Sequence, residues 1–340
     1  MYKNVYKDDS MKRQEHMAVR TTVGWYLWTH QLMKLTGDDA LDFLEYMVTG
    51  NLRTLAIGKA RYTTMLNEQG EIIDDVVIFR MDESEYWVST LFVARMDDWF
   101  YDHQGSYDVE WEDITADWHM FSVQGPKAKD VLNEIVAGGV EDLKFFSHKD
   151  YEIQGIPVIV NRGGYTGEKW GYEIYMAADQ ADEIEAVLRS ACEKAGGRQV
   201  TEFQVMAWTL PTEAGFYYMK DLAQTNPFEV GMDGSINWDK DFVGKNALLK
   251  IKEQGPKREM LGFECLEDDY LIKSGHLGGA GEAVYLDGYE EEVGRIVKLV
   301  YSYVKDVNNG YILAQKGVFK PGDHFRARGH ECVITERKWI

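Results

Sequence analysis

The sequence predicts an α+β protein that ends in a β-barrel or β-sandwich, and three observations support this prediction. The chain has 340 residues, more than one hydrophobic core usually spans, so two or three domains are expected. Strand-like and helix-like stretches mix without the regular alternation of doubly wound α/β proteins. Beyond a linker candidate, Gln-Gly-Pro-Lys at 254–257, the pattern becomes mostly strand.

The first part of the chain supplies two helices and three strands. One helix begins after Thr36-Gly37, with Leu41 and Leu44 on one face. Another begins at 124–126, where proline suits the first turn, and its apolar residues follow the helical period. The intervening stretches are apolar and β-branched, which predicts strands over 60–66, 72–80 and 86–91.

The later elements flank a glycine-rich turn and then build the C-terminal domain. Strands at 156–160 and 172–176 enclose the turn at 163–167, and a helix carries Ile184, Val187 and Leu188. The C-terminal strands are predicted over 260–265, 293–301, 311–315 and, folded about Gly329, 325–335.

Composition and charge exclude several classes of function. Hydrophobic residues make up 45% and charged residues 28%, an ordinary globular balance, but the net charge is −20. Such a surface repels phosphate backbones and anionic membranes, so neither nucleic acid nor membrane is an expected partner. Three widely spaced cysteines, a polar N-terminus and the absence of a long apolar run indicate a cytoplasmic protein with free thiols.

Several strong motifs are missing from the sequence. It contains no Walker A loop, no Gly-x-Gly-x-x-Gly after a strand, no His-Glu-x-x-His and no Cys-x-x-Cys. Nucleotide, nicotinamide or zinc chemistry therefore has no support here, and no metal site is predicted.

A pair of adjacent aspartates, Asp74 and Asp75, interrupts an apolar strand in the stretch LNEQGEIIDDVVIFRM. Successive side chains on a strand point to opposite faces, so one carboxylate is expected to face inward. An inward carboxylate is costly unless a partner completes it. A bulge or strand end with solvated carboxylates is the structural alternative, and the residues alone do not decide between the two.

Two further stretches combine glycine turns with aromatic and acidic side chains. NRGGYTGEKWGYEIY, residues 161–175, has glycines that permit close approach of a ligand, beside Tyr165, Tyr172 and Glu173. WTLPTEAGFYYMKDL, residues 208–222, places Glu213 before a glycine and aromatic residues. A tight hairpin and a helix end packed on the core remain the alternative readings of these stretches.

Taken in order, seven stretches of the chain resemble one family, the glycine-cleavage T-protein (aminomethyltransferase) and its tetrahydrofolate-dependent demethylase relatives. The resemblance runs from about His16 to the end of the chain and is collinear throughout. The stretches are EHMAVRTTVGWYLWTHQLMKLTG, GKARYTTMLNEQGEIIDDVVIFR, SVQGPKA, LKFFSHKDYEIQGIPVIVNRGGYTGEKWGYEIY, TEAGFYYMKDL, NPFEVGM and FVGKNALLKIKEQGPKREMLGFE.

The resemblance implies a three-domain cloverleaf around a central folate channel. The expected domains are 1–50 with 145–240, then 51–144, and a C-terminal β-barrel over 255–340. The resemblance also implies tetrahydrofolate as cofactor.

The same resemblance assigns residues to the cofactor. Asp75 matches the aspartate near the nitrogen that accepts the one-carbon unit, and is the candidate catalytic residue. Tyr62, Tyr165 and Glu173 match residues that line the channel or bind the pterin. A pterin presents adjacent N–H donors that a buried carboxylate accepts well, and such a carboxylate can bias protonation of the reacting nitrogen.

The chain departs from the family pattern on the donor side and near the cofactor tail. Leu27 stands where the aminomethyltransferases have an aspartate, and Trp208 replaces another. Ala207 and Pro211 occupy the positions of two arginines. Charged residues are thus replaced by apolar and aromatic ones.

These departures favour a tetrahydrofolate-dependent demethylase, which moves a methyl group from a small O-, N- or S-methyl donor to tetrahydrofolate. An aminomethyltransferase is the alternative within the class, although the −20 charge suits an acidic lipoyl carrier protein poorly. A non-catalytic folate-binding regulatory protein is the alternative from another class, because the two arginines are missing.

The donor prediction concerns aromatic residues beside these replacements. Trp28, His30 and Trp208 are the candidate substrate residues, and Trp25 lies in the same stretch. Core packing is the ordinary role of any one tryptophan. Two or more at the pocket would suit an aryl methyl ether or a methylated amine, the latter through cation–π attraction.

Overall fold

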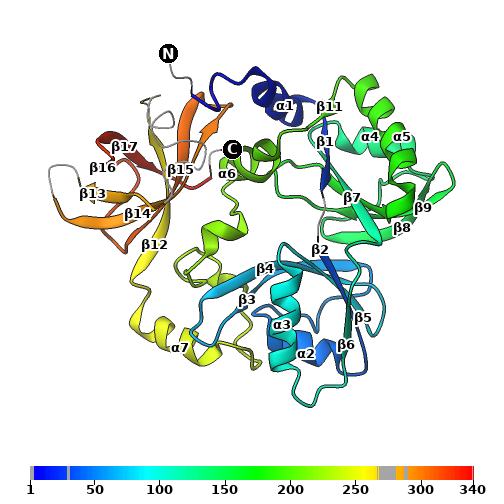
Figure 1. The fold of residues 1–340 in the computed structure, drawn as a ribbon, viewed down its shortest axis with the longest axis horizontal. Coiled ribbons are helices and arrows are strands. Elements are labelled where there is room, and N and C mark those ends of the chain that lie inside the picture. Colours follow the sequence, from blue (N-terminus) through cyan, green and yellow to red (C-terminus); the bar gives the residue numbers. More distant parts are fainter. Residues whose placement is uncertain (1–3, 29–30, 266, 268–280, 287–289, 339) are drawn as a thin grey trace.

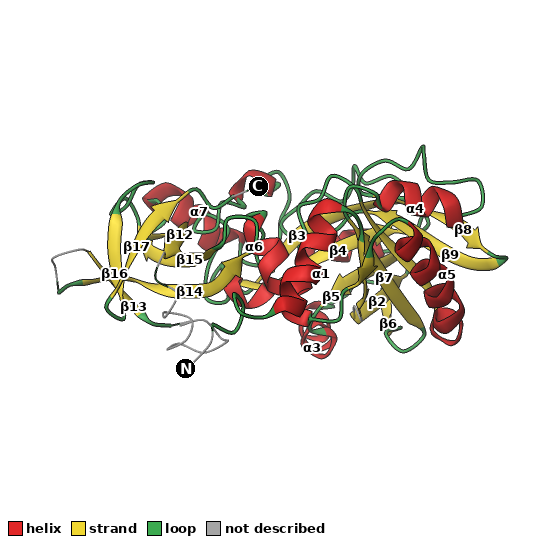
Figure 2. Ribbon diagram, turned by 90° about the horizontal axis from the view of Figure 1, so that it is seen from above, coloured by secondary structure: helices red, strands yellow, loops and turns green. Residues whose placement is uncertain are grey.

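Three lobes lie around a central segment that contains the short helix α6, Leu210–Glu213 (Figure 1). The computed structural model describes residues 4–28, 31–265, 267, 281–286, 290–338 and 340. Two lobes share one large sheet and the third is a closed barrel. Seen from above, helix α1 (Ser10–Thr21) lies between the barrel and the sheet (Figure 2). The α+β class and the C-terminal barrel are both confirmed.

The large sheet has 11 described strands in the order β11-β1-β7-β10-β9-β8-β3-β4-β5-β2-β6. Its two halves meet at one described pair, Lys59 opposite Ser147, so the joint between the lobes is narrow. The strands are β1 Gly24–Trp28, β2 Gln31–Thr36, β3 Lys59–Leu66, β4 Ile72–Arg80, β5 Glu85–Thr90, β6 Glu110–Asp113, β7 Trp118–Gln124, β8 Ser147–Ile153, β9 Ile156–Arg162, β10 Gly171–Ala177 and β11 Arg198–Gln199.

The first lobe packs helices α4 (Ala128–Ile135) and α5 (Ala181–Lys194) against strands β1, β7, β9 and β10. Its core includes Trp25, which is fully buried against Phe121. The helical period seen in the sequence therefore marks the buried faces of both helices.

The second lobe buries α2 (Ala40–Met47) and α3 (Val93–His103) against β2 to β5. The predicted strands 60–66, 72–80 and 86–91 are confirmed as β3, β4 and β5. Strand β4 pairs with β3 along nearly its whole length, which fixes the register of the two aspartates opposite Thr64 and Met65.

The third lobe is a barrel in the order β12-β15-β14-β13-β16-β17. The predicted linker separates α7 (Lys245–Gln254) from β12, and Gly329 forms the predicted turn at φ +81. None of the described helices is long and apolar enough to cross a membrane. The strands are β12 Arg258–Cys265, β13 Ala283–Leu286, β14 Glu292–Ser302, β15 Val307–Gln315, β16 His324–Ala327 and β17 His330–Thr335.

The hydrophobic cores group the chain differently from the predicted ranges. Strand β2 and helix α2, expected with 1–50 in the first domain, pack in the core of the second lobe. Strand β7 and helix α4, expected within 51–144, pack in the first. The chain crosses between lobes after β1 and again before β7, so we propose domain limits at those two crossings.

Candidate functional site

Two adjoining cavities lie where the lobes meet. The inner cavity, of about 160 Å³, and the outer cavity, of about 390 Å³, share six lining residues and so form one continuous space. The shared residues are Tyr62, Asp75, Phe146, Gly164, Tyr165 and Tyr217.

The adjacent aspartates face opposite sides of β4. Asp75 lines both cavities and accepts a hydrogen bond from the Tyr62 hydroxyl at 2.9 Å. Asp74 is buried on the other face, where it accepts a hydrogen bond from Thr90 Oγ1 at 2.5 Å. The predicted alternation is therefore confirmed, but Asp74 is also withdrawn from water and has an internal partner.

Both aspartates are harder to ionise than usual. Burial raises the pKa of Asp75 to about 7, the negative charge of Asp74 adds to this shift, and the Tyr62 hydrogen bond opposes it. Burial also raises the pKa of Asp74 to about 6, against the hydrogen bond from Thr90. At neutral pH, Asp75 can therefore either hold or release a proton.

A second acceptor group lines the inner cavity from the first lobe. Glu173 on β10 accepts a hydrogen bond from Asn161 Nδ2 on β9 at 2.8 Å. Burial raises the pKa of Glu173. Asn161 Oδ1 is buried and has no hydrogen-bond partner among the described residues. The adjacent Tyr172 points to the opposite face of the sheet, into the core, so the pleat separates it from Glu173.

The glycine turn brings Tyr165 to the cavity wall. Gly164 has φ +150, and a Cβ there would meet Gln124 Nε2 at 2.3 Å, so only glycine fits. The ring of Tyr165 lies 5.2 Å from that of Trp28. Trp28 in turn stacks on Phe203, with ring centroids 5.6 Å apart and planes 13° apart. Aromatic surface thus covers this side of the inner cavity.

The structure separates the predicted substrate residues. Trp28 lines the inner cavity, but Trp208 does not belong to the lining and packs edge-on against Phe203 at 5.9 Å. The wide turn of the π-helix Val205–Thr209 directs Ala207 to the cavity instead. His30 lies outside the described residues. Trp25, buried in the first core, has the ordinary packing role.

The replaced arginine positions, Ala207 and Pro211, both line the inner cavity. No lysine or arginine is among the described residues of that lining, whereas Arg337 lines the outer cavity. Its guanidinium donates to the Val230 carbonyl at 2.9 Å and lies over the Tyr217 ring at 4.8 Å. No group of three or more metal-ligating side chains was found in the described parts of the chain.

Several lining residues were not predicted from the sequence, among them Asn161, Phe146, Tyr218 and Arg337. The first three lie within stretches that carried the family resemblance, so the sequence indicated their neighbourhood but not the residues themselves. Arg337 follows β17, and no sequence signal there indicated a site.

The fold and the central cavity define a class of protein. The crystal structure of glycine cleavage system aminomethyltransferase T from Bartonella henselae superposes with a TM-score of 0.83 at 20% identity, covering 97% of this chain and 89% of that one. The three-lobed architecture is therefore that of the T-protein class.

Sequence comparison gives the family. The model of the GCVT N-terminal domain matches residues 2–240. The aminomethyltransferase of Thermotoga maritima is 32% identical over 320 residues, covering 91% of this chain and 83% of the relative. The probable aminomethyltransferase of Thermococcus kodakarensis is 30% identical with the same coverage. The chain belongs to the aminomethyltransferase (glycine-cleavage T-protein) family, whose members use tetrahydrofolate as substrate and cofactor.

Proposed function

We propose that this protein binds tetrahydrofolate in the two cavities and transfers a one-carbon unit to it, most directly a methyl group from a small donor. The observation that carries the proposal is the convergence of three acceptors, Asp75, Glu173 and Asn161 Oδ1, on one aromatic-walled cavity. Donor-rich, flat rings such as a pterin complement such a site.

The chain's own residues would divide the work of holding the cofactor. Asp75 and Glu173 would accept its N–H groups, while Tyr62 and Tyr165 would pack against its rings. When bound, tetrahydrofolate supplies the nitrogen that takes the one-carbon unit. Asp75, with a pKa of about 7, is suited to holding or giving a proton at that end of the cavity.

The outer cavity suits the carboxylate-bearing tail of the cofactor. Phe145 and Phe216 line it and are 59% and 43% exposed, so they form an open aromatic rim. Arg337 provides a positive charge in a protein of net charge −20. A guanidinium binds carboxylates well. Arg337 would therefore replace the two arginines of the family, whose positions Ala207 and Pro211 occupy here.

The inner cavity favours a neutral or cationic methyl donor. It has two carboxylates, Asp75 and Glu173, and no lysine or arginine among its described lining residues. Trp28 offers an indole to a methylated ammonium group, for which cation–π attraction is worth about 0.5–2 kcal/mol. We therefore favour a methylated amine over an anionic aryl methyl ether.

Aminomethyl transfer is the second candidate, because the relatives at 30–32% identity are named aminomethyltransferases. The two activities differ in product. The test is incubation with tetrahydrofolate and either methylated amines and aryl methyl ethers, or an aminomethylated lipoyl protein, followed by mass spectrometry of the folate. We expect 5-methyltetrahydrofolate from a methylated amine.

Three other outcomes would each contradict one part of the proposal. 5,10-Methylenetetrahydrofolate from the lipoyl protein alone would establish aminomethyl transfer instead. Binding without turnover of any donor would indicate a non-catalytic folate-binding protein. If saturating tetrahydrofolate leaves the melting temperature unchanged, folate binding itself is contradicted.

A further inference from the structure

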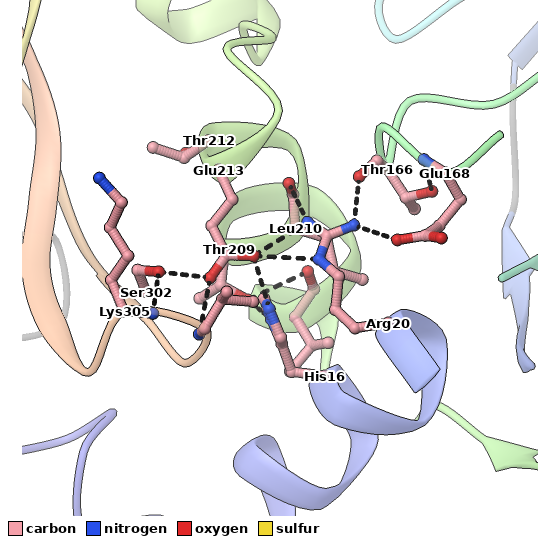
Figure 3. A network of polar contacts seen from close by, with 12 residues as sticks. His16, Arg20, Thr166, Glu168, Thr209, Leu210, Thr212, Glu213, Ser302 and Lys305 are labelled. Carbon is pink, nitrogen blue, oxygen red and sulfur yellow. Dashed lines mark hydrogen bonds and ion pairs between the residues drawn. The ribbon is translucent and has the colours of Figure 1, made fainter. Parts of the chain in front are cut away.

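Two of the sequence stretches, around His16 and around Glu213, meet in a buried polar network that lies outside the cavities (Figure 3). His16 and Arg20 project from α1, Glu213 ends α6, and Ser302 ends β14 of the barrel. Glu168 directly follows the glycine turn at 163–167. The network therefore joins helix α1, helix α6, the segment after the glycine turn and the barrel.

Arg20 uses all five of its N–H donors in this network. Its Nε and one terminal nitrogen donate to Glu213 Oε2, both at 3.0 Å, and the latter also donates to the Leu210 carbonyl at 2.9 Å. The other terminal nitrogen donates to the Thr166 carbonyl and to Glu168 Oε1, both at 2.7 Å. The side chain is only 6% exposed, so each bond is shielded from water.

The two backbone carbonyls that Arg20 binds adjoin the wall of the inner cavity. Thr166 follows Tyr165, and Leu210 precedes Pro211, and both of these neighbours line the cavity. In the turn that carries Tyr165, Gly164 and Gly167 lie at positive φ, and the Thr166 hydroxyl donates to Gln124 Oε1 at 2.8 Å. The guanidinium links that turn to α6.

Glu213 fixes the position of Arg20 relative to the barrel. Its Oε2 is 2.8 Å from His16 Nε2, and its Oε1 accepts hydrogen bonds from Ser302 Oγ at 2.6 Å and from the Val304 amide at 3.3 Å. His16 and Glu213 are both fully buried. None of His16, Arg20 and Glu213 lines either cavity.

We propose that Arg20 is a positioning residue for the cofactor site: it holds the turn bearing Tyr165 at a fixed distance from the wall bearing Pro211, while Glu213 ties this arrangement to the barrel. The identity of the ligand rests on the proposed function, whereas the restraint of the turn by Arg20 does not. Lysine keeps the charge of arginine but has three donors in place of a planar fork of five, so it cannot make these bonds together.

The test combines Arg20→Lys with Tyr165→Ala in a double-mutant cycle, read as the dissociation constant of tetrahydrofolate by calorimetry. In the wild-type background Arg20→Lys should weaken binding about tenfold, and in the Tyr165→Ala background less than about twofold, because Arg20 acts through that turn. Hydrogen exchange supplies a readout without folate: backbone amides of residues 163–168 should exchange faster in Arg20→Lys.

Arg258→Lys is the matched control. Arg258 makes a similar bidentate pair with Glu229 and a bond to the Gln224 carbonyl, but away from the cavities. It should change neither tetrahydrofolate affinity nor exchange at 163–168. If Arg20→Lys does not fold, Glu168→Ala removes the less buried end of the same linkage and should weaken binding about threefold.

Additive effects of Arg20→Lys and Tyr165→Ala, or unchanged exchange at 163–168, would overturn the inference. If wild-type protein fails to bind tetrahydrofolate, the proposed function is wrong, and the exchange measurement still decides whether Arg20 restrains the turn. Faster exchange across the whole molecule, matched in the control, would show a merely structural role and would also overturn it.

Discussion

Two buried acidic centres in this molecule have opposite electrostatics. In the cavity, burial raises the pKa of Asp75 to about 7 and also raises that of Glu173. In the network at the end of α6, burial opposes ionisation of Glu213 as well, but the donors His16, Arg20 and Ser302 lower its pKa to about 2.

The difference between the two centres lies in their partners. Glu213 has a guanidinium and several hydrogen-bond donors, which offset the cost of burying its charge. The inner cavity has no lysine or arginine among its described lining residues, and the side-chain hydrogen bond that Asp75 accepts comes from Tyr62. We infer that a buried carboxylate whose partners the protein supplies serves the fold, whereas one left short of donors is a candidate ligand-binding group.

The largest expected effect is the loss of activity in Asp75→Asn. Asparagine keeps the shape of the side chain but neither its charge nor its capacity to exchange a proton, so turnover should fall about 10²–10⁴-fold. Asp74→Asn is the matched control and should be milder, because Asp74 is buried on the other face of β4 and lines neither cavity. Steady-state assays with the identified donor measure both, and equal activity in the two variants would contradict the facing of the pair.

Asp75 should also make stability depend on pH. A carboxyl with a raised folded pKa binds more protons in the folded state, so stability falls as pH rises from about 4, the unfolded value, towards about 7. Asp74 and Glu173, whose pKa values are also raised, add to this decline. Asp75→Asn should therefore reduce the decline and be more stable than wild type at pH 8, and each unit of the shift is worth about 1.4 kcal/mol. Urea unfolding at pH 5 and pH 8 measures it; parallel wild-type and variant profiles would contradict the raised pKa.

Glu213→Gln should instead destabilise the fold. Breaking this buried pair leaves Glu168 as the remaining carboxylate partner of Arg20 and costs about 3–5 kcal/mol of unfolding free energy. Because the folded pKa is lowered, the stabilisation is present above about 4.3, the unfolded value, and is lost as pH falls through about 2. Denaturant unfolding at pH 7 measures the loss. Glu173→Gln is the control and should not lower stability. A similar loss of stability in Glu213→Gln and Glu173→Gln would contradict the difference between the two acidic centres.

A smaller effect is expected at the cofactor tail. Arg337→Gln removes the positive charge from the outer cavity and should weaken tetrahydrofolate binding about tenfold, or about 1.4 kcal/mol. A tetrahydropterin without the glutamate tail should bind wild type and Arg337→Gln equally. This ligand therefore distinguishes a lost contact with the tail from a distortion of the cavity. Calorimetry with the two ligands decides, and equal weakening of both would exclude the tail assignment.

The smallest effect distinguishes the two tryptophans. Trp28→Ala should raise the KM for a methylated amine by about 2- to 30-fold, the equivalent of about 0.5–2 kcal/mol. Trp208→Ala should change it less, because Trp208 lies behind Phe203 rather than in the cavity lining. The comparison is made by initial rates with saturating tetrahydrofolate. If Trp28→Ala keeps full activity, the Trp28 indole does not contact the methyl donor.

Strands β2, β6 and β13 were not predicted. The sequence alone did predict the α+β class, the family, strands β3 to β5 of the second lobe, and strands β12, β14, β15, β16 and β17 of the barrel. These features are local or collinear: Ile72 to Arg80 read as a strand from their own side chains, and the glycine turn at 163–167 needs glycine wherever it occurs. Strand alternation even placed Asp74 and Asp75 on opposite faces before any partner was known.

Contacts between residues that are distant in the sequence could be seen only in the tertiary structure. Arg20 and Glu213 are 193 positions apart, and Arg337 reaches the cavity from the last part of the barrel, so no local pattern links them. The exchange of β2 and β7 between the two cores, and the turn of Trp208 away from the cavity, likewise depend on packing between distant segments. Burial and charge pairing are properties of the assembled chain, which is why Asp75 and Glu213 look alike in the sequence and differ in the fold.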